Sequence, residues 1–600
     1  MREPVIGIDL GTTFSALACV VEGRPEIVNN RDGKRLTPSM VGFTERGDRL
    51  VGQRARLLAE DMPENVVFAA KRFIGRRWSQ NLADEAKSVV PYGIVPGPNG
   101  EVRIRIAGRT LPVTQISAMI LGELRLDAEA HFGKPVHQAV ITVPANFDDG
   151  QRNATKEAAR IAGLEVLRLL NEPTAAAVAY GLDKGFQGRA LVFDLGGGTF
   201  DVSILEVQNG VFEVRATGGD PHLGGEDFDN RIVQWLVAQV PPGVREALSS
   251  DPLSMQRLKV AAETAKRTLS TAHEAHIAVK GLGDHGEGRK LFDLDTALTR
   301  DFFEALSQPL SERCLEVCKQ VMQEAKIEPN AVDAVLLVGG MTRVPLLRRL
   351  VSTLFGRDPV GGVNPDEVVA LGAAIHAHEI AQRSGRALLI DVAAQSLGVG
   401  VLGGRVRKLI AKNTTIPVSV REIFLPGQAG QTRARIPIYQ GENEEQDANH
   451  KLGELVLREL NGGDRASAPI EVVFELASDA TLSVRATDLN TGQAEAIRIE
   501  ARPQLAPGEE QRLAREEAAY AQKRSAEDAQ RQGDHFERLL QKAERLVRIL
   551  QRGVEENPTD EARATVSSVQ TLVDLGRAAL AAANPQQLAE IRVRLARFVN

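Results

Sequence analysis

The sequence contains the same strand–turn–strand pattern twice. Residues 5–20, VIGIDLGTTFSALACV, and residues 191–205, LVFDLGGGTFDVSIL, each lead into Asp-Leu-Gly, a turn of small residues with a Thr, and a second apolar run. Glycines in such a turn let backbone N–H groups approach an anion, and an Asp at a strand end can hold the water shell of a magnesium ion. One copy is weak evidence, because most glycine turns are structural. Two matching copies predict a duplicated domain that holds the phosphates of a nucleotide between its halves.

Length and composition bound the class of protein. The chain has 600 residues, more than the roughly 250–300 that one hydrophobic core serves, so at least three domains are expected. Its 43% hydrophobic and 25% charged residues are typical of a globular protein, and its net charge of −6 argues against a nucleic-acid binder. Any affinity for phosphate must therefore come from local geometry.

Cysteine usage and apolar runs indicate the compartment. Three cysteines cannot form a disulfide framework, and Cys314 and Cys318, four apart in a helical pattern, are predicted to be core residues. No apolar run approaches the roughly 20 residues of a membrane span, and the first residues, MREPVIGIDLG, enter a strand without a signal-peptide layout. We therefore expect a cytoplasmic protein with neither nucleic acid nor membrane as a partner.

The pattern of the sequence changes along the chain. From 1 to 384, strands alternate with helices as in an α/β domain: a strand at 139–147 precedes a helix at 150–163. An apolar linker follows at 385–395. From 396 to 503, short alternating runs separated by Gly, Asn and Asp predict an antiparallel β-sandwich. Helical spacing of Ala, Glu, Arg and Leu, after a helix start at Pro507-Gly508-Glu509, predicts a helical subdomain over 504–600.

The wider set of motifs resembles one known family. No Walker-type loop and no G-x-G-x-x-G that opens a helix occurs. The paired hairpins instead resemble the superfamily of actin, sugar kinases and heat-shock ATPases, which implies an actin-like ATPase with duplicated lobes. Segments along the whole chain resemble the seventy-kilodalton heat-shock chaperone family of the DnaK type: IGIDLGTTFS (6–15), VITVPANFDDGQR (140–152), LLNEPTAAAVAYGL (169–182), FDLGGGTFDVSIL (193–205), HLGGEDFDNR (222–231), LLVGGMTRVP (336–345), NPDEVVALGAAI (364–375), AKNTTIP (411–417), YQGE (439–442) and QGDH (532–535).

This resemblance implies an ATPase that binds ATP/ADP with Mg²⁺ and K⁺, coupled to protein folding. The catalytic residues would be Lys71, Glu172, Asp194, Thr199, Asp9 and Asp201, with Asp9 and Asp194 holding the metal through water. The nucleotide contacts would be Gly11, Thr12, Thr13, Gly196, Gly197, Gly198, Glu263, Lys266, Arg267, Ser270, Gly340, Arg343 and Asp366. Positioning and electrostatics carry most of phosphoryl transfer, so such a set suffices for hydrolysis. Without the family, Lys71 could be a surface cation and residues 263–270 an exposed helix face.

The resemblance also implies coupling to a peptide-binding β domain beneath a helical lid. Coupling would run through Pro144, Arg152, Leu388, Leu389, Ile390 and Asp391, although in isolation the apolar run could be an edge strand. A groove for apolar segments of unfolded or client polypeptides would be lined by Val399, Leu402, Phe424, Gly427, Ala434 and Ile436. A J-domain co-chaperone of the DnaJ type would dock on Arg168, Asn171 and Thr174, and an exchange factor of the GrpE type is a further expected partner.

Several positions depart from the family pattern and indicate a divergent paralogue. Phe14 stands where the family has Asn, Asn146 where it has an aromatic residue, and Ala393-Ala394-Gln395 where it has Thr-Pro-Leu. Ala434 replaces a larger residue in the central peptide pocket. The sequence leaves open an HscA-like chaperone dedicated to iron–sulfur cluster assembly. A sugar kinase or an actin-like filament ATPase would share the hairpins, but a sugar kinase has no use for a β domain, an apolar linker and a lid.

Overall fold

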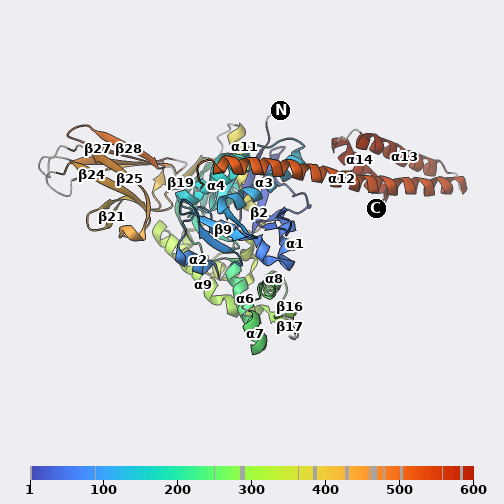
Figure 1. Ribbon diagram of the computed structural model, residues 1–600, viewed down its shortest axis with the longest axis horizontal. Helices are drawn as coiled ribbons and strands as arrows, with labels where there is room; N and C mark the ends of the chain where they lie inside the picture. The colour runs from blue at the N-terminus through green and yellow to red at the C-terminus, as the bar shows by residue number, and fades with distance from the viewer. Residues whose placement is uncertain are drawn as a thin grey trace. The chain divides into compact units, whose positions relative to one another are not determined.

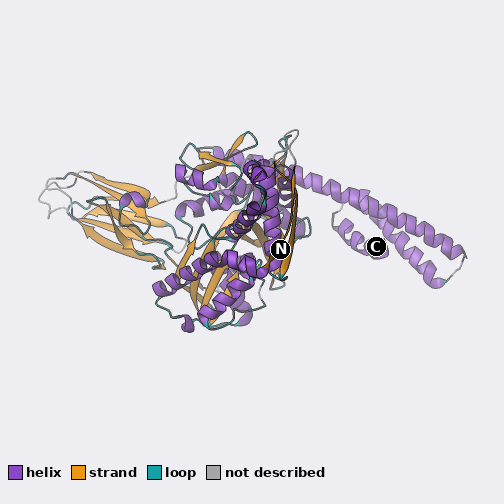
Figure 2. Cartoon of the chain, turned by 90° about the horizontal axis from the view of Figure 1, so that it is seen from below, coloured by secondary structure: helices purple, strands orange, loops and turns teal. Residues whose placement is uncertain are grey.

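The computed structural model describes residues 3–87, 90–248, 251–283, 291–362, 364–382, 388–425, 431–458, 460, 469–477, 480–499, 505–556, 559–581 and 585–599. The chain divides into two compact units, Met1–His131 with Val136–Ala514, and Phe132–Pro135 with Arg515–Asn600. Figure 1 labels many of the helices and strands, and Figure 2 distinguishes helices from strands by colour.

The first large sheet contains the first hairpin. Its strand order is β12-β11-β1-β2-β3, with β4 beside β2. The central strand β1 runs parallel to β11 and antiparallel to β2, so the glycine turn leaves the sheet at the carboxyl end of β1. The strands are β1 (Val5–Asp9), β2 (Phe14–Val21), β3 (Arg24–Ile27), β4 (Leu36–Pro38), β11 (Gln138–Val143) and β12 (Glu165–Asn171).

The second large sheet repeats this local topology around the second hairpin. Its order is β18-β13-β14-β15-β19-β22, in which β13 runs parallel to β18 and antiparallel to β14. Buried apolar side chains cover both faces of the sheet. Among them, the rings of Phe193 and Phe200 pack with their centroids 4.6 Å apart. The strands are β13 (Gly188–Leu195), β14 (Phe200–Gln208), β15 (Val211–Asp220), β18 (Ala334–Val338), β19 (Leu388–Val392) and β22 (Thr415–Ile416).

Helices pack on these sheets, and smaller elements complete this part of the chain. α11 packs on β1 and α5, and α9 packs on β14 and β15. The helices are α1 (Gln53–Asp61), α2 (Gln80–Ala86), α3 (Val113–Phe132), α4 (Asp149–Ile161), α5 (Glu172–Lys184), α6 (Gly225–Gln239), α7 (Pro242–Leu248), α8 (Pro252–Leu269), α9 (Arg300–Ala325), α10 (Pro345–Phe355) and α11 (Val368–Gln382). The smaller elements include β5 (Val41–Phe43), β6 (Arg49–Val51), β7 (Val66–Val67), η2 (Ala70–Arg72), β8 (Gly93–Pro96), β9 (Val102–Ile106), β10 (Arg109–Pro112), β16 (Glu274–Leu282), β17 (Phe292–Thr299) and η4 (Gly340–Arg343).

The described residues between 397 and 499, named the β region, form two antiparallel sheets with a shared core, apart from β22, which pairs with β19. Their orders are β21-β20-β24-β25 and β23-β26-β27-β28, and Phe474, Val484 and Leu457 are buried between them. Figure 2 shows this region as almost entirely strand. The strands are β20 (Leu397–Val401), β21 (Arg405–Ile410), β23 (Val418–Phe424), β24 (Arg433–Gln440), β25 (His450–Arg458), β26 (Ile470–Leu476), β27 (Leu482–Asp488) and β28 (Ala494–Ile499).

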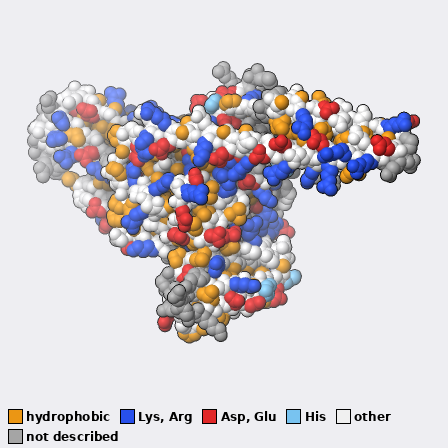
Figure 3. Space-filling model, turned by 45° about the vertical axis from the view of Figure 1, so that its right-hand side comes forward, with side chains coloured by type: hydrophobic (Ala, Val, Ile, Leu, Met, Phe, Trp, Pro, Cys, Tyr) orange, Lys and Arg blue, Asp and Glu red, His pale blue; other side chains and the backbone are white. Residues whose placement is uncertain are grey.

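Three helices follow: α12 (Glu509–Glu556), α13 (Asp560–Ala581) and α14 (Pro585–Val599). In the second unit they pack around Phe536, Leu540, Val569 and Leu595, and Arg577 bonds Glu544 at 2.8 Å across two helices. The described residues contain no helix that is long and apolar enough to cross a membrane. On the face drawn in Figure 3, acidic and basic side chains are interspersed.

Local sequence patterns predicted several elements correctly. The helix expected at 150–163 is α4 (Asp149–Ile161), and α12 begins at Glu509, as expected from Pro507-Gly508-Glu509. The strand expected at 139–147 is β11, but it ends at Val143. Cys314 and Cys318 are fully buried on α9, as core residues should be. The mixed α/β sheets and the helical C-terminal region therefore agree with the fold class expected from the sequence.

Candidate functional site

The two glycine turns lie against each other. A Cβ atom built on Gly197 would lie 1.8 Å from Thr13 Oγ1, and one built on Gly198 would lie 2.8 Å from Thr12 Cγ2. Neither position has room for a side chain, so the backbones of the two turns meet with only small groups between them. The structure thus brings together the two turns that the sequence assigned to phosphate binding.

Hydrogen bonds hold each turn in shape and leave one donor free. In the second turn, the Gly196 N–H donates to the Thr199 carbonyl at 3.1 Å, and in the first, Ser39 Oγ donates to the Gly11 carbonyl at 2.7 Å. The Thr13 hydroxyl is buried and makes no hydrogen bond. Because buried polar groups in proteins nearly always have a partner, this hydroxyl between two glycine turns suits an anion such as a phosphate.

Acidic residues and one lysine gather beside the turns. Asp9 ends β1, and Asp194 and Asp201 are register partners on β13 and β14. Lys71, in η2, donates from Nζ to Glu172 Oε1 at 2.6 Å, and both side chains are about nine-tenths buried. Lys71 is therefore not the surface cation that its sequence context alone would permit.

Burial and neighbouring charges shift the pKa values of the three aspartates and of Lys71. Burial, together with the charge of Glu172, raises the pKa of Asp9 to about 7 and that of Asp201 to about 8. Burial and the same glutamate also raise the pKa of Asp194 well above its usual range. Burial would lower the pKa of Lys71, but Glu172 and Asp9 outweigh it, so that pKa is raised. A second cation would stabilise these carboxylates in their ionised form.

The donor set fits a magnesium ion held partly by a nucleotide. Among the described residues no three His, Cys, Asp or Glu side chains are placed to ligate a metal together. Mg²⁺ is commonly held by one or two carboxylates, water and substrate phosphates rather than by an all-protein cage. Asp9 and Asp194, at the ends of β1 and β13 beside the turns, could supply such carboxylates.

The expected adenosine contacts lie on two segments that meet. A Cβ atom built on Gly225 would lie 3.1 Å from both Lys266 Nζ and Met341 Cγ, so α8 and η4 both reach the start of α6. Gly340 begins η4, and Arg343 Nη2 donates to Asp366 Oδ2 at 2.7 Å. Because the Gly225 N–H donates to the Gly196 carbonyl at 2.9 Å, both predicted segments reach the start of α6 beside the second turn.

Three residues of the α8 set already take part in ion pairs. Glu263 accepts from Arg56 Nη2 of α1 at 3.0 Å, and Arg267 lies 3.7 Å from the same glutamate. Lys266 donates to Asp229 at 2.8 Å. Ser270, the C-cap of α8, bonds back to the Lys266 carbonyl at 3.4 Å. The α8 face is thus not an ordinary exposed surface, because Glu263 on it contacts Arg56 of α1.

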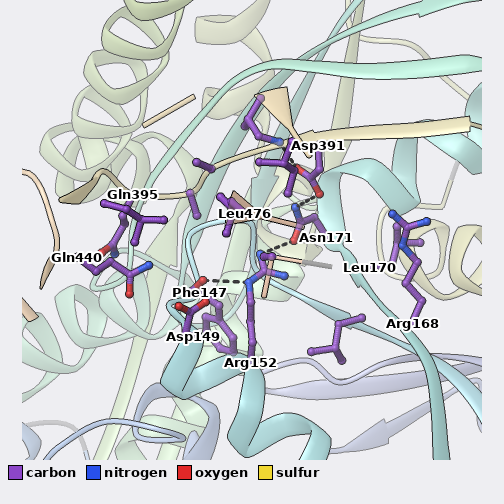
Figure 4. A pocket seen from close by; sticks show the side chains of 17 residues that line it. Phe147, Asp149, Arg152, Arg168, Leu170, Asn171, Asp391, Gln395, Gln440 and Leu476 are labelled. Atoms are coloured by element: carbon purple, nitrogen blue, oxygen red, sulfur yellow. Dashed lines mark hydrogen bonds between the residues drawn. The ribbon is translucent and has the colours of Figure 1, made fainter. Parts of the chain in front are cut away.

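Hydrogen bonds join Arg152, Asn171 and Asp391 (Figure 4), and Asn171 is the residue before Glu172. Asn171, the residue before Glu172, donates from Nδ2 to Asp391 Oδ2 at 2.6 Å and accepts from Arg152 Nη2 at 2.7 Å. Arg152 also donates to the Phe147 carbonyl at 3.1 Å. The Phe147 N–H bonds the Pro144 carbonyl at 3.2 Å, which ties Pro144 to the same loop. Arg152, Pro144 and Asp391, predicted as coupling residues, are therefore connected.

The apolar segment after residue 384 forms a strand of the second sheet. In β19, Leu388, Leu389 and Ile390 pair in parallel with Val211, Phe212 and Glu213 of β15. On its other side β19 pairs with β22 of the β region. Burial raises the pKa of Asp391, against the lowering effect of Arg152. The apolar run that could be an edge strand in isolation thus pairs along β15, whereas Asp391 and Val392 of β19 pair with β22.

Arg152, Asn171 and Asp391 border a pocket that Figure 4 shows from close by. Phe147, Arg152 and Asn171 line it from one side, and Gln395, Gln440 and Leu476 from the β region. Gln395 belongs to the Ala-Ala-Gln departure, so this sequence difference lies at the contact between the two regions. Of the expected J-domain residues, Asn171 and Thr174 are buried and Arg168 is half-buried.

The expected peptide-groove residues separate into two environments. Val399, Ala434 and Ile436 are buried in the core of the β region, and Phe424 packs against that core. Leu402 is 75% exposed, and Ile423 and Leu425, which the prediction did not include, are 57% and 61% exposed. Gly427 lies outside the described residues.

Sequence reasoning missed several long-range contacts at these sites. Lys412 and Asn413, inside the AKNTTIP motif, bond Glu324 of α9 at 3.0 and 2.8 Å. Arg103 of β9 holds Glu509 of α12 through two hydrogen bonds of 3.0 and 2.7 Å. Arg72 lies beside Lys71 and against the second turn. The only signal for Arg72 was its position next to Lys71, since no local pattern shows partners this far away in sequence.

A comparison with protein-family models agrees with this geometry. The model described as Hsp70 protein matches residues 5–598, nearly the whole chain. Members of that family are chaperones and ATPases that bind ATP or ADP with Mg²⁺. The chain belongs to the seventy-kilodalton heat-shock protein family.

Proposed function

We propose that this chain is an ATP-dependent chaperone, in which hydrolysis between the two glycine turns is coupled to the binding and release of apolar segments of client polypeptides. Residues 1–384 would bind the nucleotide, 385–395 would link, 396–503 would bind peptide and 504–600 would form the lid. The observation that carries the proposal is the continuous path from Lys71 to the linker, because Glu172 bonds Lys71 and its neighbour Asn171 bonds Asp391.

Residues of the chain have distinct roles in this proposal. The glycine turns would hold the phosphates, and Lys71 would stabilise the charge that develops on the transferred phosphoryl group. Asp9 and Asp194 would hold Mg²⁺ through water, with K⁺ as a further ion, and Glu172 and Asp201 would orient the attacking water. The metal supplies electrostatic stabilisation of the phosphate oxygens.

The β region supports the peptide-binding part of the proposal. Exposed apolar side chains that lie on neighbouring segments are typical of a docking surface. Leu402 follows β20, and Ile423 and Leu425 lie at the end of β23, which is held to β21 by the 3.0 Å bond from Arg407 to Glu422. Client segments, a J-domain co-chaperone and an exchange factor are the proposed partners.

The test is ATP hydrolysis in single turnover and at steady state, with and without an unfolded peptide and with no sugar acceptor. We expect slow basal hydrolysis that peptide stimulates. ATP must also release a bound fluorescent peptide. Hydrolysis that requires a sugar would contradict the proposal in favour of a kinase, and polymer that sediments with ATP would favour a filament. Peptide binding that ATP leaves unchanged would contradict the coupling.

A further inference from the structure

Arg72, a charged residue beside the glycine turns, has no role in the proposed mechanism of hydrolysis. Arg72 ends η2, and its side chain is 8% exposed. Its Nε and Nη2 atoms are buried and make no hydrogen bond. A guanidinium carries five N–H donors and stays charged at any ordinary pH, so burial with unpaired donors is unfavourable unless an anion approaches. Arg72 therefore has donors to offer at the place where it lies.

That place is the second glycine turn. A Cβ atom built on Gly198 would lie 2.8 Å from Arg72 Nε and 3.3 Å from Nη2, and the same atom would lie 2.8 Å from Thr12 Cγ2 of the first turn. Arg72 thus lies against the backbone of one turn at the point where the other turn meets it. A phosphate held by both turns would be within reach of a planar donor fork, and guanidinium groups bind phosphate oxygens through two parallel hydrogen bonds.

The carboxylates that face Arg72 do not fully satisfy it. Nη2 lies 3.2 Å from Glu226 Oε2 and 3.7 Å from Asp227 Oδ2, both in the first turn of α6. Glu226 Oε2 is itself buried without a hydrogen bond. Charge attracts the two groups, but their geometry is not that of a closed bidentate pair. Glu226 therefore resembles a competitor for the guanidinium more than a permanent partner.

We propose that Arg72 binds the terminal phosphate of the nucleotide and the orthophosphate left after hydrolysis, and that Glu226 competes with this phosphate for the guanidinium. The proposal rests on the proposed function, in which the nucleotide lies between the two turns. Hydrolysis adds water across the bond between the β and γ phosphates and leaves ADP, orthophosphate and a proton. The site therefore holds a phosphate anion before and after the reaction, and Arg72 retains the product.

Competition and structural pairing predict different outcomes. If Arg72 and Glu226 formed a purely structural ion pair, removing either charge would destabilise the contact between η2 and α6 in the same way. If they compete, Arg72→Gln removes the phosphate ligand, whereas Glu226→Gln frees the guanidinium for phosphate. The two variants must then change the effect of phosphate in opposite directions.

The measurement is the dissociation rate of fluorescent ADP, with orthophosphate or with chloride at equal ionic strength. In the parent, orthophosphate should slow ADP release. Arg72→Gln should reduce that effect at least about fivefold, the loss expected for a charge-assisted contact, and Glu226→Gln should enlarge it. Arg77→Gln, an exposed arginine of the same segment, is the matched control and should behave as the parent. Arg72→Lys keeps the charge but not the fork, so a reduced phosphate effect is expected even if Arg72→Gln does not fold.

Three outcomes separate the hypotheses. A parent that binds no ADP would overturn the proposed function itself. A parent that binds ADP but shows no orthophosphate effect, or an effect unchanged in both Arg72 variants, would overturn this inference alone. Equal changes of the same sign in Arg72→Gln and Glu226→Gln would make the pair structural.

Discussion

Lys71 is held by charge on a buried glutamate, and this contact determines what its removal should do. Lys71→Ala should reduce the rate of hydrolysis at least about 100-fold while ATP still binds, because the ammonium stabilises mainly the charge that develops in the transition state. Single-turnover hydrolysis and nucleotide binding are the two measurements. Lys87→Ala is the control, since that lysine is 74% exposed. A variant that hydrolyses ATP near the parent rate would remove Lys71 from the proposed mechanism.

Phe14, which departs from the family pattern, contacts Arg56, the α1 member of the ion pair with Glu263 of α8. The Arg56 guanidinium carbon lies 5.7 Å from the Phe14 ring centroid, and Arg56 bonds Glu263 on α8. A cation–π contact of this kind contributes about 0.5–1 kcal/mol. Phe14→Leu should therefore speed ADP release about two- to fivefold, measured by stopped flow, because Arg56 is then held less firmly toward Glu263.

Glu263→Gln is the companion variant for that prediction. It removes the carboxylate that Arg56 contacts, so it should speed ADP release more than Phe14→Leu does. If Glu263→Gln accelerates ADP release and Phe14→Leu does not, the Phe14 ring contributes nothing to the Arg56–Glu263 contact. Equal acceleration in both variants would mean that the ring is required for the pair to form.

At the scale of single elements, local pattern was enough to place many helices and strands. One of the alternating runs expected between 396 and 503 forms β24, and Pro507-Gly508 before Glu509 predicted the start of α12, because both signals act within a few residues. The same sequence could not show what α12 contacts. Arg103 and Glu509 are separated by 406 positions, and no periodic pattern connects residues at that distance. The repeated hairpin pattern located the two turns, but neither that pattern nor the resemblance assigned a role to Arg72 or Glu226.

The first turn of α12 provides a matched pair of contacts. Glu509 is 10% exposed and binds Arg103, which also holds the buried Glu101, whereas Glu510 is 37% exposed and binds Arg160, 49% exposed. A buried pair that loses one partner leaves an uncompensated charge, while exposed pairs contribute about 0–1 kcal/mol. Glu509→Gln should lower the opening free energy of this turn by about 2 kcal/mol, and Glu510→Gln by less than about 1.

Amide hydrogen exchange over residues 505–514 is the measurement for these variants. Both substitutions remove one negative charge from the helix N-terminus, so the loss of favourable interaction with the helix dipole is common to the two. The difference between them therefore reports the buried contact with Arg103. Equal exchange in the two variants would show that the contact with β9 does not hold the helix start.

At the scale of the whole molecule, the question is whether nucleotide and peptide control each other. Coupling requires one element whose state both ligands change. β19 is suited to this, since it pairs with β15 on one side and β22 on the other, and Asp391 within it bonds the residue next to Glu172. Lys412 and Asn413 add a second contact to α9. The departures at Asn146 and at 393–395 lie in or beside the pocket where these elements meet. Measuring the coupling in this chain therefore shows how much sequence variation at this contact it tolerates.

Leu389→Asp places a charge on the strand that must lie against β15, where Leu389 pairs with Phe212. We expect basal hydrolysis and the peptide affinity of the ADP state to remain, because neither the turns nor the β region is altered. Peptide-stimulated hydrolysis and ATP-triggered peptide release should both be lost, because an ionised side chain opposes insertion into the sheet. Leu575→Asp, the same change at a leucine of α13 that is 48% exposed, should retain both. The measurement is stopped-flow release of a fluorescent peptide on adding ATP. Equal, fast release from the parent and from Leu389→Asp would show that β19 does not carry the coupling, and would leave the Lys412–Glu324 contact as the route between the two regions.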